Sequence, residues 1–404
     1  MSEGKAASPA PVRRALDGIK VVAFEASVAA PHCSRMLADM GAEVIKIERP
    51  GEGDLIRHWD SAVHGLSSGY VWLNWNKRSL AIDVKQPAGK EVILKLVAQA
   101  DVFLENFAPG VVERLGLGPA DLCQLNARLI YCSLSGYGQQ GPYRDVKAYD
   151  LLVQGESGII ATTGYKDQMA RAGIAIADLT SSMYAALSIM MALFQRERSG
   201  RGQTIDLSMF EAMTAWLGYF PHYYWHRGEE PERTGMRHPY ITPYGPYRAG
   251  DGVWVSVAVA TAQDWVKFCK LVLQRPDLLE DARFDTVEHR RHNRAVLEEI
   301  VERLFLTQPH QEWLARLRAA DMAYGLVRGI GEVLNHPQIE ARQMIGEVDS
   351  PVGRLPVMRS PMRLSDSPPR FDRIPDLGED SEAILRELGY DDAAIGKLRQ
   401  DKVI

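Results

Sequence analysis

One aspartate, Asp178, stands out because the residues before it are almost all small or apolar. It follows the run Arg171–Ala177 and precedes a long apolar helix expected over residues 179–196. The simplest role for an aspartate at a helix start is a cap that accepts hydrogen bonds from the first free N–H groups. The positive end of the helix dipole would also keep it ionised, and an ionised carboxylate can act as a nucleophile. Composition alone favours the cap, but the two roles are compatible.

Several basic residues stand beside glycines or loop signals and could bind phosphate groups. They are Arg49, Lys77, Arg78, Lys85, Arg114 and Lys147. Taken singly, each is more simply a solvated surface residue. The first expected strand–turn–helix passes through Glu25–Pro31, which lacks the G-x-G-x-x-G pattern that brings backbone close to a pyrophosphate. The sequence therefore predicts no NAD, FAD or P-loop nucleotide site and no permanently bound cofactor.

Other catalytic patterns are weak. His222 and His226 could share one helix face, but H-Y-Y-W-H lacks the glutamate that a zinc protease uses as its base, so packing or lid contacts are preferred. No G-x-S-x-G elbow of a serine hydrolase is present. The four cysteines have no metal-like spacing and are too sparse for a disulfide framework. We expect no metal and a reduced, cytoplasmic setting.

Composition narrows the class of protein further. The chain has 404 residues, enough for two or three domains, and its net charge of −5 argues against a general nucleic-acid binder. Its first residues lack the apolar run of a signal peptide and suggest a loose tail. We expect that no apolar stretch approaches the roughly 18 residues of a membrane span, so no membrane partner is expected.

The expected elements form two groups. Strands near residues 19–24, 43–47, 101–105, 129–133 and 204–207 alternate with helices near 30–40, 89–99 and 179–196. This alternation predicts a doubly wound, mainly parallel α/β domain. A strand near 253–259 and helices near 262–273, 294–304 and 311–319 predict a smaller α+β domain. The expected division is a tail at 1–15, a large domain at 16–215, a linker or lid at 216–245, a small domain at 246–345 and a return segment at 346–404, with short helices near 381–388 and 393–400.

From about Leu16 to its end, the chain resembles the class III CoA-transferases, or CaiB/BaiF family, which includes formyl-CoA transferase and the carnitine CoA-transferases. The resemblance is carried by Leu37–Glu48 (LADMGAEVIKIE), Asn76–Ser79 (NKRS), Asp101–Phe107 (DVFLENF) and Gly200–Gln203 (GRGQ). It implies a Rossmann-like large domain that binds CoA, with CoA as part of the substrate. It also implies a homodimer of two interlocked rings, or pairing with a paralogous subunit.

Two segments favour transfer over racemisation. The α-methylacyl-CoA racemases share the scaffold but have a His–Asp pair where this chain has Tyr149-Asp150. A tyrosine, with a reference pKa of about 10, is a poor base at neutral pH. The segment Arg233–Gly245 resembles the R-x-G-x-R-H-P…P-Y-G stretch of the transferases. A racemase or epimerase stays as the first alternative, and a non-catalytic CoA-binding subunit of a hetero-oligomer as the second.

The resemblance also assigns site residues. It implies that Asp178 is the nucleophile, forming an acyl anhydride and then a CoA thioester. It places the adenosine-diphosphate side of CoA against Arg49, Ile82, Asp83, Val84, Lys85, Asn106, Phe107 and Ala108, with charge from Arg114 and Lys147. The pantetheine and thioester would be bordered by Val28, Ala29, Ala148, Tyr149 and Asp150.

The identity of the two acids is inferred from differences between this chain and formyl-CoA transferase and from basic residues that could bind a carboxylate. Formyl-CoA transferase has a glutamine where this chain has Val28, and its glycine-rich flap is absent here, so formyl-CoA and oxalate are disfavoured as the pair. Arg171, Arg237 and His238 could bind a second carboxylate. We therefore expect succinyl-CoA as donor and a C4–C5 dicarboxylate as acceptor, such as malate, citramalate, mesaconate or itaconate.

Overall fold

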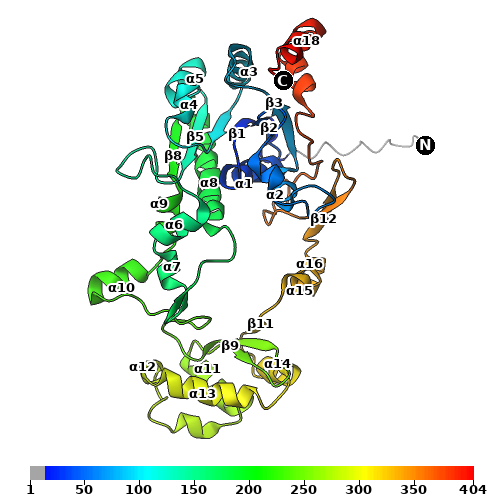
Figure 1. Cartoon of the computed structure of the whole chain (residues 1–404). Coiled ribbons are helices and arrows are strands. Elements are labelled where there is room, and N and C mark those ends of the chain that lie inside the picture. Colours follow the sequence, from blue (N-terminus) through cyan, green and yellow to red (C-terminus); the bar gives the residue numbers. More distant parts are fainter. Residues whose placement is uncertain (1–13) are drawn as a thin grey trace, which may run out of the picture. The chain divides into compact units, whose positions relative to one another are not determined.

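The computed structural model describes residues 14–404 and divides into two compact units (Figure 1). The first unit takes the residues up to Ser157, then Gly173–Leu217 and Gln338–Ile404. The second takes Gly158–Ala172 and Gly218–Pro337. The division thus assigns Gly158–Ala172 to the second unit, whereas the sequence analysis included it in the large domain. Apart from residues 14 and 15, the expected tail lies outside the described residues.

A six-stranded sheet organises the first unit. Its order is β3-β2-β1-β4-β5-β8, and every neighbouring pair is parallel. The strands are β1 Lys20–Phe24, β2 Glu43–Glu48, β3 Lys77–Ala81, β4 Val102–Glu105, β5 Ile130–Ser135 and β8 Thr204–Ser208. The expected doubly wound parallel sheet is confirmed. The strand order reverses between β1 and β4, and ligands of such folds bind at the carboxyl ends of the strands beside this reversal.

The type of residue that each strand buries explains which strands could be predicted from the sequence. Strands β4 and β5 are buried along their whole lengths, as expected for a parallel sheet covered on both faces, so they read as apolar runs. Strand β3 begins Lys77-Arg78-Ser79, and the sequence analysis did not identify it. Both Lys77 and Ser79 are nevertheless buried, because partners inside the fold compensate their polar groups.

Helices cover the sheet and connect its strands. They include α1 Ala29–Asp39, α2 Ser68–Asn74, α3 Pro87–Val97, α4 Val111–Arg114, α5 Pro119–Leu125, α6 Asp150–Glu156, α8 Ile176–Ser199 and α9 Met209–Ala215, with a 3-10 turn at Leu55–His58. Helix α8 packs against α1, α6, α9, β5 and β8. Because α8 leads into the parallel strand β8, its N-terminus lies at the carboxyl edge of the sheet.

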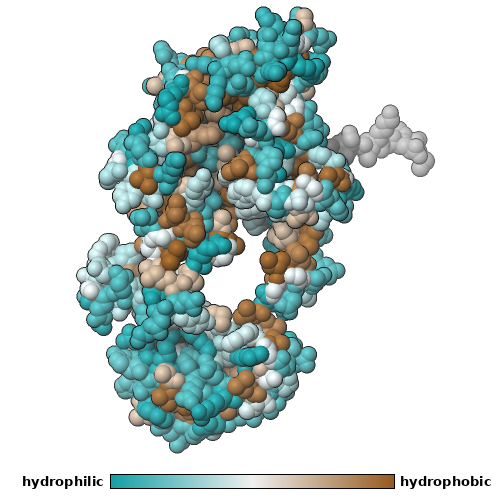
Figure 2. Space-filling model, viewed as in Figure 1, coloured by the Kyte–Doolittle hydropathy of each residue, from teal (hydrophilic) through white to brown (hydrophobic). Residues whose placement is uncertain are grey.

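Helix α8 corrects one expectation. It has 24 residues, and its best 18-residue window has a mean hydropathy of 1.4, so by length and composition it could cross a membrane. The expectation that no stretch approaches this length is therefore wrong. Its contacts with the sheet and with α1 account for part of this apolar character. An outer stripe of Met183, Leu187, Met191 and Phe194 stays exposed, and apolar surface is visible on the first unit in Figure 2.

The C-terminal segment packs on the edge strand β3. It contains the hairpin β12 Ile345–Val348 and β13 Leu355–Met358, then α17 Ser381–Glu387 and α18 Asp392–Gln400. The Asp380 carboxylate accepts the Ser79 N–H at 2.9 Å, and the Ser381 hydroxyl accepts the Ala81 N–H at 3.1 Å. The Val403 carbonyl accepts the Asp83 N–H at 2.8 Å. The end of the chain therefore fixes the segment that leaves β3.

The second unit has an antiparallel sheet of order β11-β10-β9, formed by Tyr324–Leu326, Trp254–Ala258 and Tyr244–Arg248. In its core, the Phe305 ring stacks on Trp313 at 4.3 Å between centroids and makes a tilted contact with Tyr247 at 5.0 Å. The other elements are α7 Ile159–Thr162, β6 Gly164–Tyr165, β7 Gln168–Met169, α10 Phe220–Arg227, α11 Ala262–Lys267 with a π turn at Phe268–Val272, a 3-10 turn at Pro276–Leu279, α12 Val287–His292, α13 Arg294–Phe305, α14 His310–Ala319, α15 Ile330–Leu334 and, across the boundary, α16 Pro337–Ala341. The segment expected as a loop-rich lid thus contains α10 and the start of β9.

Candidate active site

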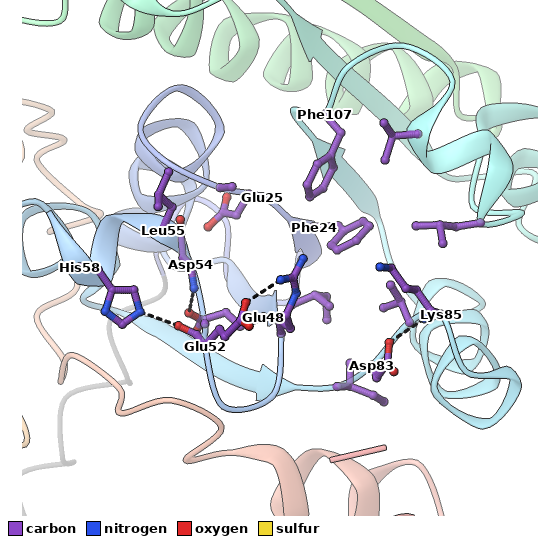
Figure 3. A pocket seen from close by; sticks show the side chains of 18 residues that line it. Phe24, Glu25, Glu48, Glu52, Asp54, Leu55, His58, Asp83, Lys85 and Phe107 are labelled. Carbon is purple, nitrogen blue, oxygen red and sulfur yellow. Dashed lines mark hydrogen bonds and ion pairs between the residues drawn. The ribbon is translucent and has the colours of Figure 1, made fainter. Parts of the chain in front are cut away.

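A cavity of about 520 Å³ opens at the carboxyl ends of β1, β2, β3 and β4 (Figure 3). This is the edge at which the strand order predicts a ligand site. The lining residues are Phe24, Glu25, Ala26, Ile47, Glu48, Arg49, Glu52, Gly53, Asp54, Leu55, His58, Ile82, Asp83, Val84, Lys85, Phe107, Val111 and Leu115. Six residues expected to bind CoA therefore share this cavity: Arg49, Ile82, Asp83, Val84, Lys85 and Phe107.

One side of the cavity is apolar and aromatic. The rings of Phe24 and Phe107 lie 4.5 Å apart between centroids, and Figure 3 shows both directed toward the cavity. Apolar side chains from β2 and from the segments after β3 and β4 continue this wall. Such a wall can receive a flat heterocycle, whose faces prefer aromatic and aliphatic contacts over water.

A buried network of three acids and three bases supports the opposite side. Lys46 contacts Asp54 at 2.8 Å and Glu25 at 3.4 Å, and Lys77 contacts Glu25 at 2.7 Å. Arg57 donates two hydrogen bonds to Glu48, at 2.8 and 2.9 Å. Burial alone would lower the pKa of Lys46, but Asp54 and Glu25 more than offset this and raise it. Each of the three acids of this network thus has a cation of the network as partner.

The network and Asn106 together hold the turn between β1 and α1. Ser27 in this turn has a φ of 62°, a left-handed conformation that is uncommon outside glycine. Asp54 accepts the Ser27 N–H at 3.0 Å. Asn106 accepts the Ala26 N–H at 2.9 Å and donates to the Ala26 carbonyl at 2.8 Å. Asn106, which was expected to contact CoA, therefore uses its side chain to shape the cavity wall.

The rim of the cavity carries exposed charges. The Arg49 guanidinium contacts the Glu52 carboxylate at 2.5 Å, and both side chains are mostly exposed. The His58 Nε2–H donates to the Glu52 carbonyl at 2.8 Å. Lys85 is also exposed. Arg49 and Lys85 are the cations in this lining that are not part of the buried network, so an anionic ligand would meet them first.

The remaining residues expected to bind CoA lie outside the cavity lining. Arg114 and Lys147 are exposed. The Ala108 carbonyl accepts the Val111 N–H, and Ala148 lies close to Gly136. Val28 and Ala29 are buried at the start of α1, and Tyr149 is 67% exposed at the start of α6. The sequence analysis did not identify Phe24 and Glu48 as cavity residues. Their positions at the ends of two strands could have indicated this.

The structure corrects the expected capping role of Asp178. Helix α8 begins at Ile176, so Asp178 is its third residue, and the cap position holds Ala175. Asp150, the first residue of α6, accepts the N–H groups of Ala177 at 2.8 Å and of Asp178 at 3.4 Å. Among residues 14–404, none donates a hydrogen bond to the Asp178 carboxyl group.

The expected ionisation of Asp178 is also corrected. Burial, followed by the negative charge of Asp150, raises the pKa of Asp178 to about 7. Both effects oppose the helix dipole, and the contribution of a dipole to a partly solvated group is small. The carboxyl group therefore changes charge near neutral pH, and its lone pairs are not engaged by a donor. These are properties of a catalytic carboxylate.

One helical turn after Asp178, α1 contacts α8 through a polar pair. The Ser182 hydroxyl donates to the Leu179 carbonyl at 2.7 Å, so it must accept the hydrogen bond from His32 Nδ1 at 2.6 Å. Burial, followed by the charges of Arg35 and Lys77, lowers the pKa of His32 to about 3. His32 is therefore neutral and adds no charge to this face of α8.

The three candidates for binding a second carboxylate, Arg171, Arg237 and His238, belong to the second unit. Arg237 contacts Glu302 at 2.8 Å and Glu298 at 3.3 Å, so carboxylates of its own unit already engage its guanidinium. His238 Nδ1 accepts the N–H groups of Tyr240 and Ile241, which leaves the proton on Nε2. Arg171 is exposed and donates to the Ala172 carbonyl at 3.0 Å.

The pair His222 and His226 lies on α10, as its spacing allows. Nδ1 of His226 donates to the His222 carbonyl at 2.8 Å, and His222 contacts the Trp225 ring edge-on at 5.3 Å. Both contacts are between neighbouring turns of α10 itself.

Comparisons of the sequence and of the structure with known proteins identify the same family. The family model "CoA-transferase family III" matches residues 16–381. A human succinyl-CoA:glutarate CoA-transferase is 34% identical over 394 residues, covering 96% of this chain and 90% of that protein. A succinyl-CoA–D-citramalate CoA-transferase of Chloroflexus aurantiacus is 34% identical over 398 residues, covering 97% and 98%. The crystal structure of a CaiB/BaiF family protein from Brucella suis has a TM-score of 0.83 and 36% identity, covering 93% and 100%.

Proposed function

The chain belongs to CoA-transferase family III, and from this premise we propose that it moves CoA from succinyl-CoA to a C4–C5 dicarboxylic acid through covalent intermediates on Asp178. The observation that carries the proposal is the Asp178 carboxyl group. It has no hydrogen-bond donor among the described residues, and its pKa is raised to about 7. Its helix begins at the same sheet edge as the 520 Å³ cavity.

In the proposed mechanism, the donor acid and the acceptor acid each take part in two nucleophilic attacks. The Asp178 carboxylate attacks the thioester carbonyl of the donor, the C–S bond breaks, and a mixed anhydride and CoA thiolate form. The thiolate attacks the aspartyl carbonyl, which releases the donor acid and leaves an aspartyl-CoA thioester. The acceptor carboxylate attacks this thioester, and the released thiolate then attacks the acceptor carbonyl of the new anhydride. Asp178 is regenerated with no net proton transfer, so covalent catalysis divides one difficult exchange into easier steps.

The raised pKa of Asp178 supports this role. A carboxylate that binds a proton more tightly is also a stronger nucleophile toward a carbonyl carbon. At neutral pH about half of the population is ionised, because the pKa is about 7. An acyl anhydride hydrolyses readily, so the same partial burial that raises the pKa also protects the intermediate from water.

The cavity supports binding of the nucleotide end of CoA. The Phe24–Phe107 wall suits the adenine ring, and Arg49 and Lys85 suit the phosphates. Relatives named for succinyl-CoA with glutarate or citramalate support a C5 dicarboxylate as acceptor. Glutarate thus joins the acceptors expected from the sequence. Relatives named for oxalate also exist, at 33% and 31% identity, and provide the contrasting substrate.

A donor–acceptor screen tests the proposal. Succinyl-CoA is mixed with glutarate, citramalate, malate, mesaconate, itaconate or oxalate, and the CoA esters are separated by chromatography. A new CoA ester with a C4–C5 dicarboxylate is the expected result, and product with oxalate alone would contradict the substrate assignment. Exchange of the proton at C2 of an acyl-CoA in heavy water, without any acceptor acid, would instead support the racemase alternative.

The contact between Arg49 and Glu52 leads to a prediction about CoA affinity. Glu52→Gln is expected to lower the KM for succinyl-CoA about two- to fivefold, since an exposed ion pair contributes at most about 1 kcal/mol. The carboxylate occupies Arg49 at 2.5 Å and would compete there with a phosphate. Steady-state kinetics at low ionic strength measures the change. Glu91→Gln, which removes an exposed acid from the Lys95 pair on α3, is the matched control and should leave KM unchanged. A higher KM for Glu52→Gln would contradict the competition.

We also propose a homodimer, supported by the exposed apolar stripe of α8. Sedimentation equilibrium should give about twice the chain mass of 45.0 kDa. Activity of the purified chain alone would exclude the need for a second, catalytic subunit. A monomer at micromolar concentration would contradict the dimer without affecting the proposed chemistry.

A further inference from the structure

We propose that Asp150 is a positioning residue for Asp178, which caps helix α8 from a neighbouring helix and presents its charge to the nucleophile. The role of Asp178 as nucleophile rests on the proposed function. The cap itself stands on hydrogen bonds within the first unit.

The start of α8 has no cap of its own. The first N–H groups of a helix lack partners within the helix, and side-chain oxygens normally accept them. Here the cap position holds Ala175, whose side chain cannot accept a hydrogen bond. The Asp150 Oδ1 accepts the Ala177 N–H at 2.8 Å and, less closely, the Asp178 N–H at 3.4 Å. The backbone of the nucleophile is therefore fixed by a residue 28 positions earlier in the chain.

The Asp150 side chain is itself held in place. Its second oxygen, Oδ2, accepts a hydrogen bond from Gln154 Nε2 at 2.7 Å. Gln154 lies one turn further along α6 and is fully buried. The carboxylate thus receives hydrogen bonds on both oxygens, and its orientation toward α8 is set by packing of α6 against α8.

Aspartate is a common capping residue, but here the cap lies close to a second acid, Asp178. Serine or asparagine would satisfy the same N–H groups, and neither would place a like charge beside Asp178. A second carboxylate disfavours ionisation of the first, which opposes the helix dipole. The charge of Asp150 thus acts on the pKa of Asp178 in addition to the hydrogen bonds that cap the helix. We infer that the charge increases the basicity of the nucleophile.

Among residues 14–404, no other charge near α8 has this effect. The elements packed against α8 bring several other titratable groups: His32, Cys33, Arg35 and Asp39 from α1, Glu156 from α6, Glu211 from α9, Asp206 from β8, and Tyr131 and Cys132 from β5. His32 is neutral, and Arg35 is paired with Asp39 at 3.5 Å. Apart from burial, Asp150 is the one group in the described part of the chain that shifts the pKa of Asp178.

The pH profile of kcat/KM tests the inference through two variants. In the wild type, activity should rise with pH with an apparent pKa of about 7, because the ionised carboxylate is the nucleophile. Asp150→Asn retains an oxygen for the cap but removes the charge, so the rise should move about one unit toward lower pH. Asp150→Ala also removes the cap and should lower the plateau kcat about 10–100-fold, since misplaced groups lose that much.

Asp145→Asn is the matched control, because Asp145 is an exposed acid in the loop before α6 and contacts Arg144. Its profile should coincide with that of the wild type. Profiles that coincide for the wild type and Asp150→Asn would overturn the inference, as would equal shifts for both asparagine variants. If the wild type transfers no CoA to any acid, the proposed function fails, and a second measurement then decides the role of Asp150.

That measurement uses stability and needs no turnover. The gain in Tm caused by Asp178→Asn is measured from pH 4 to 8, alone and in combination with Asp150→Asn. A carboxyl group whose pKa is raised on folding destabilises the protein increasingly as the pH rises to that pKa. The gain should therefore grow until about pH 7 with Asp150 present and level off at lower pH without its charge. Identical curves in the two backgrounds would overturn the inference.

Discussion

Asp178→Asn is expected to lower kcat for CoA exchange at least about 10⁴-fold, because every proposed covalent step passes through this carboxylate. An amide of the same shape cannot form the anhydride. The KM for succinyl-CoA should change less than about threefold, since Asp178 does not line the cavity proposed to hold the nucleotide end. Chromatography of the CoA esters and steady-state kinetics measure both quantities.

The stability of the same variant distinguishes loss of chemistry from loss of fold. The pKa of Asp178 is raised on folding, so the folded protein binds its proton more tightly than the unfolded chain between about pH 4 and pH 7. Stability therefore decreases as the pH rises through this window, and the wild type carries the full penalty above it. Asp178→Asn removes the penalty and should have an equal or higher Tm at pH 8.

Two outcomes would contradict the nucleophile assignment. One is an Asp178→Asn variant that keeps more than about 1% of the wild-type kcat after removal of any deamidated protein. The other is the absence of a hydroxylamine adduct on the peptide containing Asp178 after incubation of the wild type with succinyl-CoA. Asp145→Asn provides the control for both, since it removes an exposed carboxylate from the same unit.

The parallel sheet could be predicted because most of its strands are buried and apolar. Strand β5 is buried at every position and was expected from its run of apolar residues. Strand β3 was missed because a buried lysine is rare unless partners inside the fold compensate it. For Lys77 these partners are Glu25, Asn74 and the Pro31 carbonyl, all distant along the chain or visible only in the folded structure.

The candidate site was predictable in part. Motif resemblance located Arg49, Lys85 and Phe107, and the structure brings them into one cavity. The motif resemblance could not indicate that Asp150 caps α8, because a cap from another helix leaves no local sequence signal. The ionisation of Asp178 was mispredicted for the same reason: the helix dipole follows from sequence position, whereas burial and the neighbouring charge follow from packing.

Lys46→Met is expected to lower the free energy of unfolding of the first unit by about 3–5 kcal/mol, the usual effect of removing one partner from a buried ion pair. Methionine fits a similar volume, so lost packing is a minor contribution. The lysine is fully buried and contacts Asp54 at 2.8 Å and Glu25 at 3.4 Å. Without it, Asp54 keeps only hydrogen bonds from N–H groups such as that of Ser27. Denaturation in urea, followed by fluorescence, measures the loss.

Lys95→Met is the matched control, since Lys95 makes an exposed ion pair with Glu91 at 2.9 Å, and it should change stability by less than about 1 kcal/mol. Equal losses in the two variants would contradict a special role for the buried network. The network also supports function, because Asp54 holds the strained Ser27 turn beside the cavity wall. A Lys46→Met protein that remains folded should therefore bind CoA more weakly. An apolar replacement of all six charges could match the stability of the network, but it could not accept the Ser27 N–H, and the shape of the cavity depends on that bond.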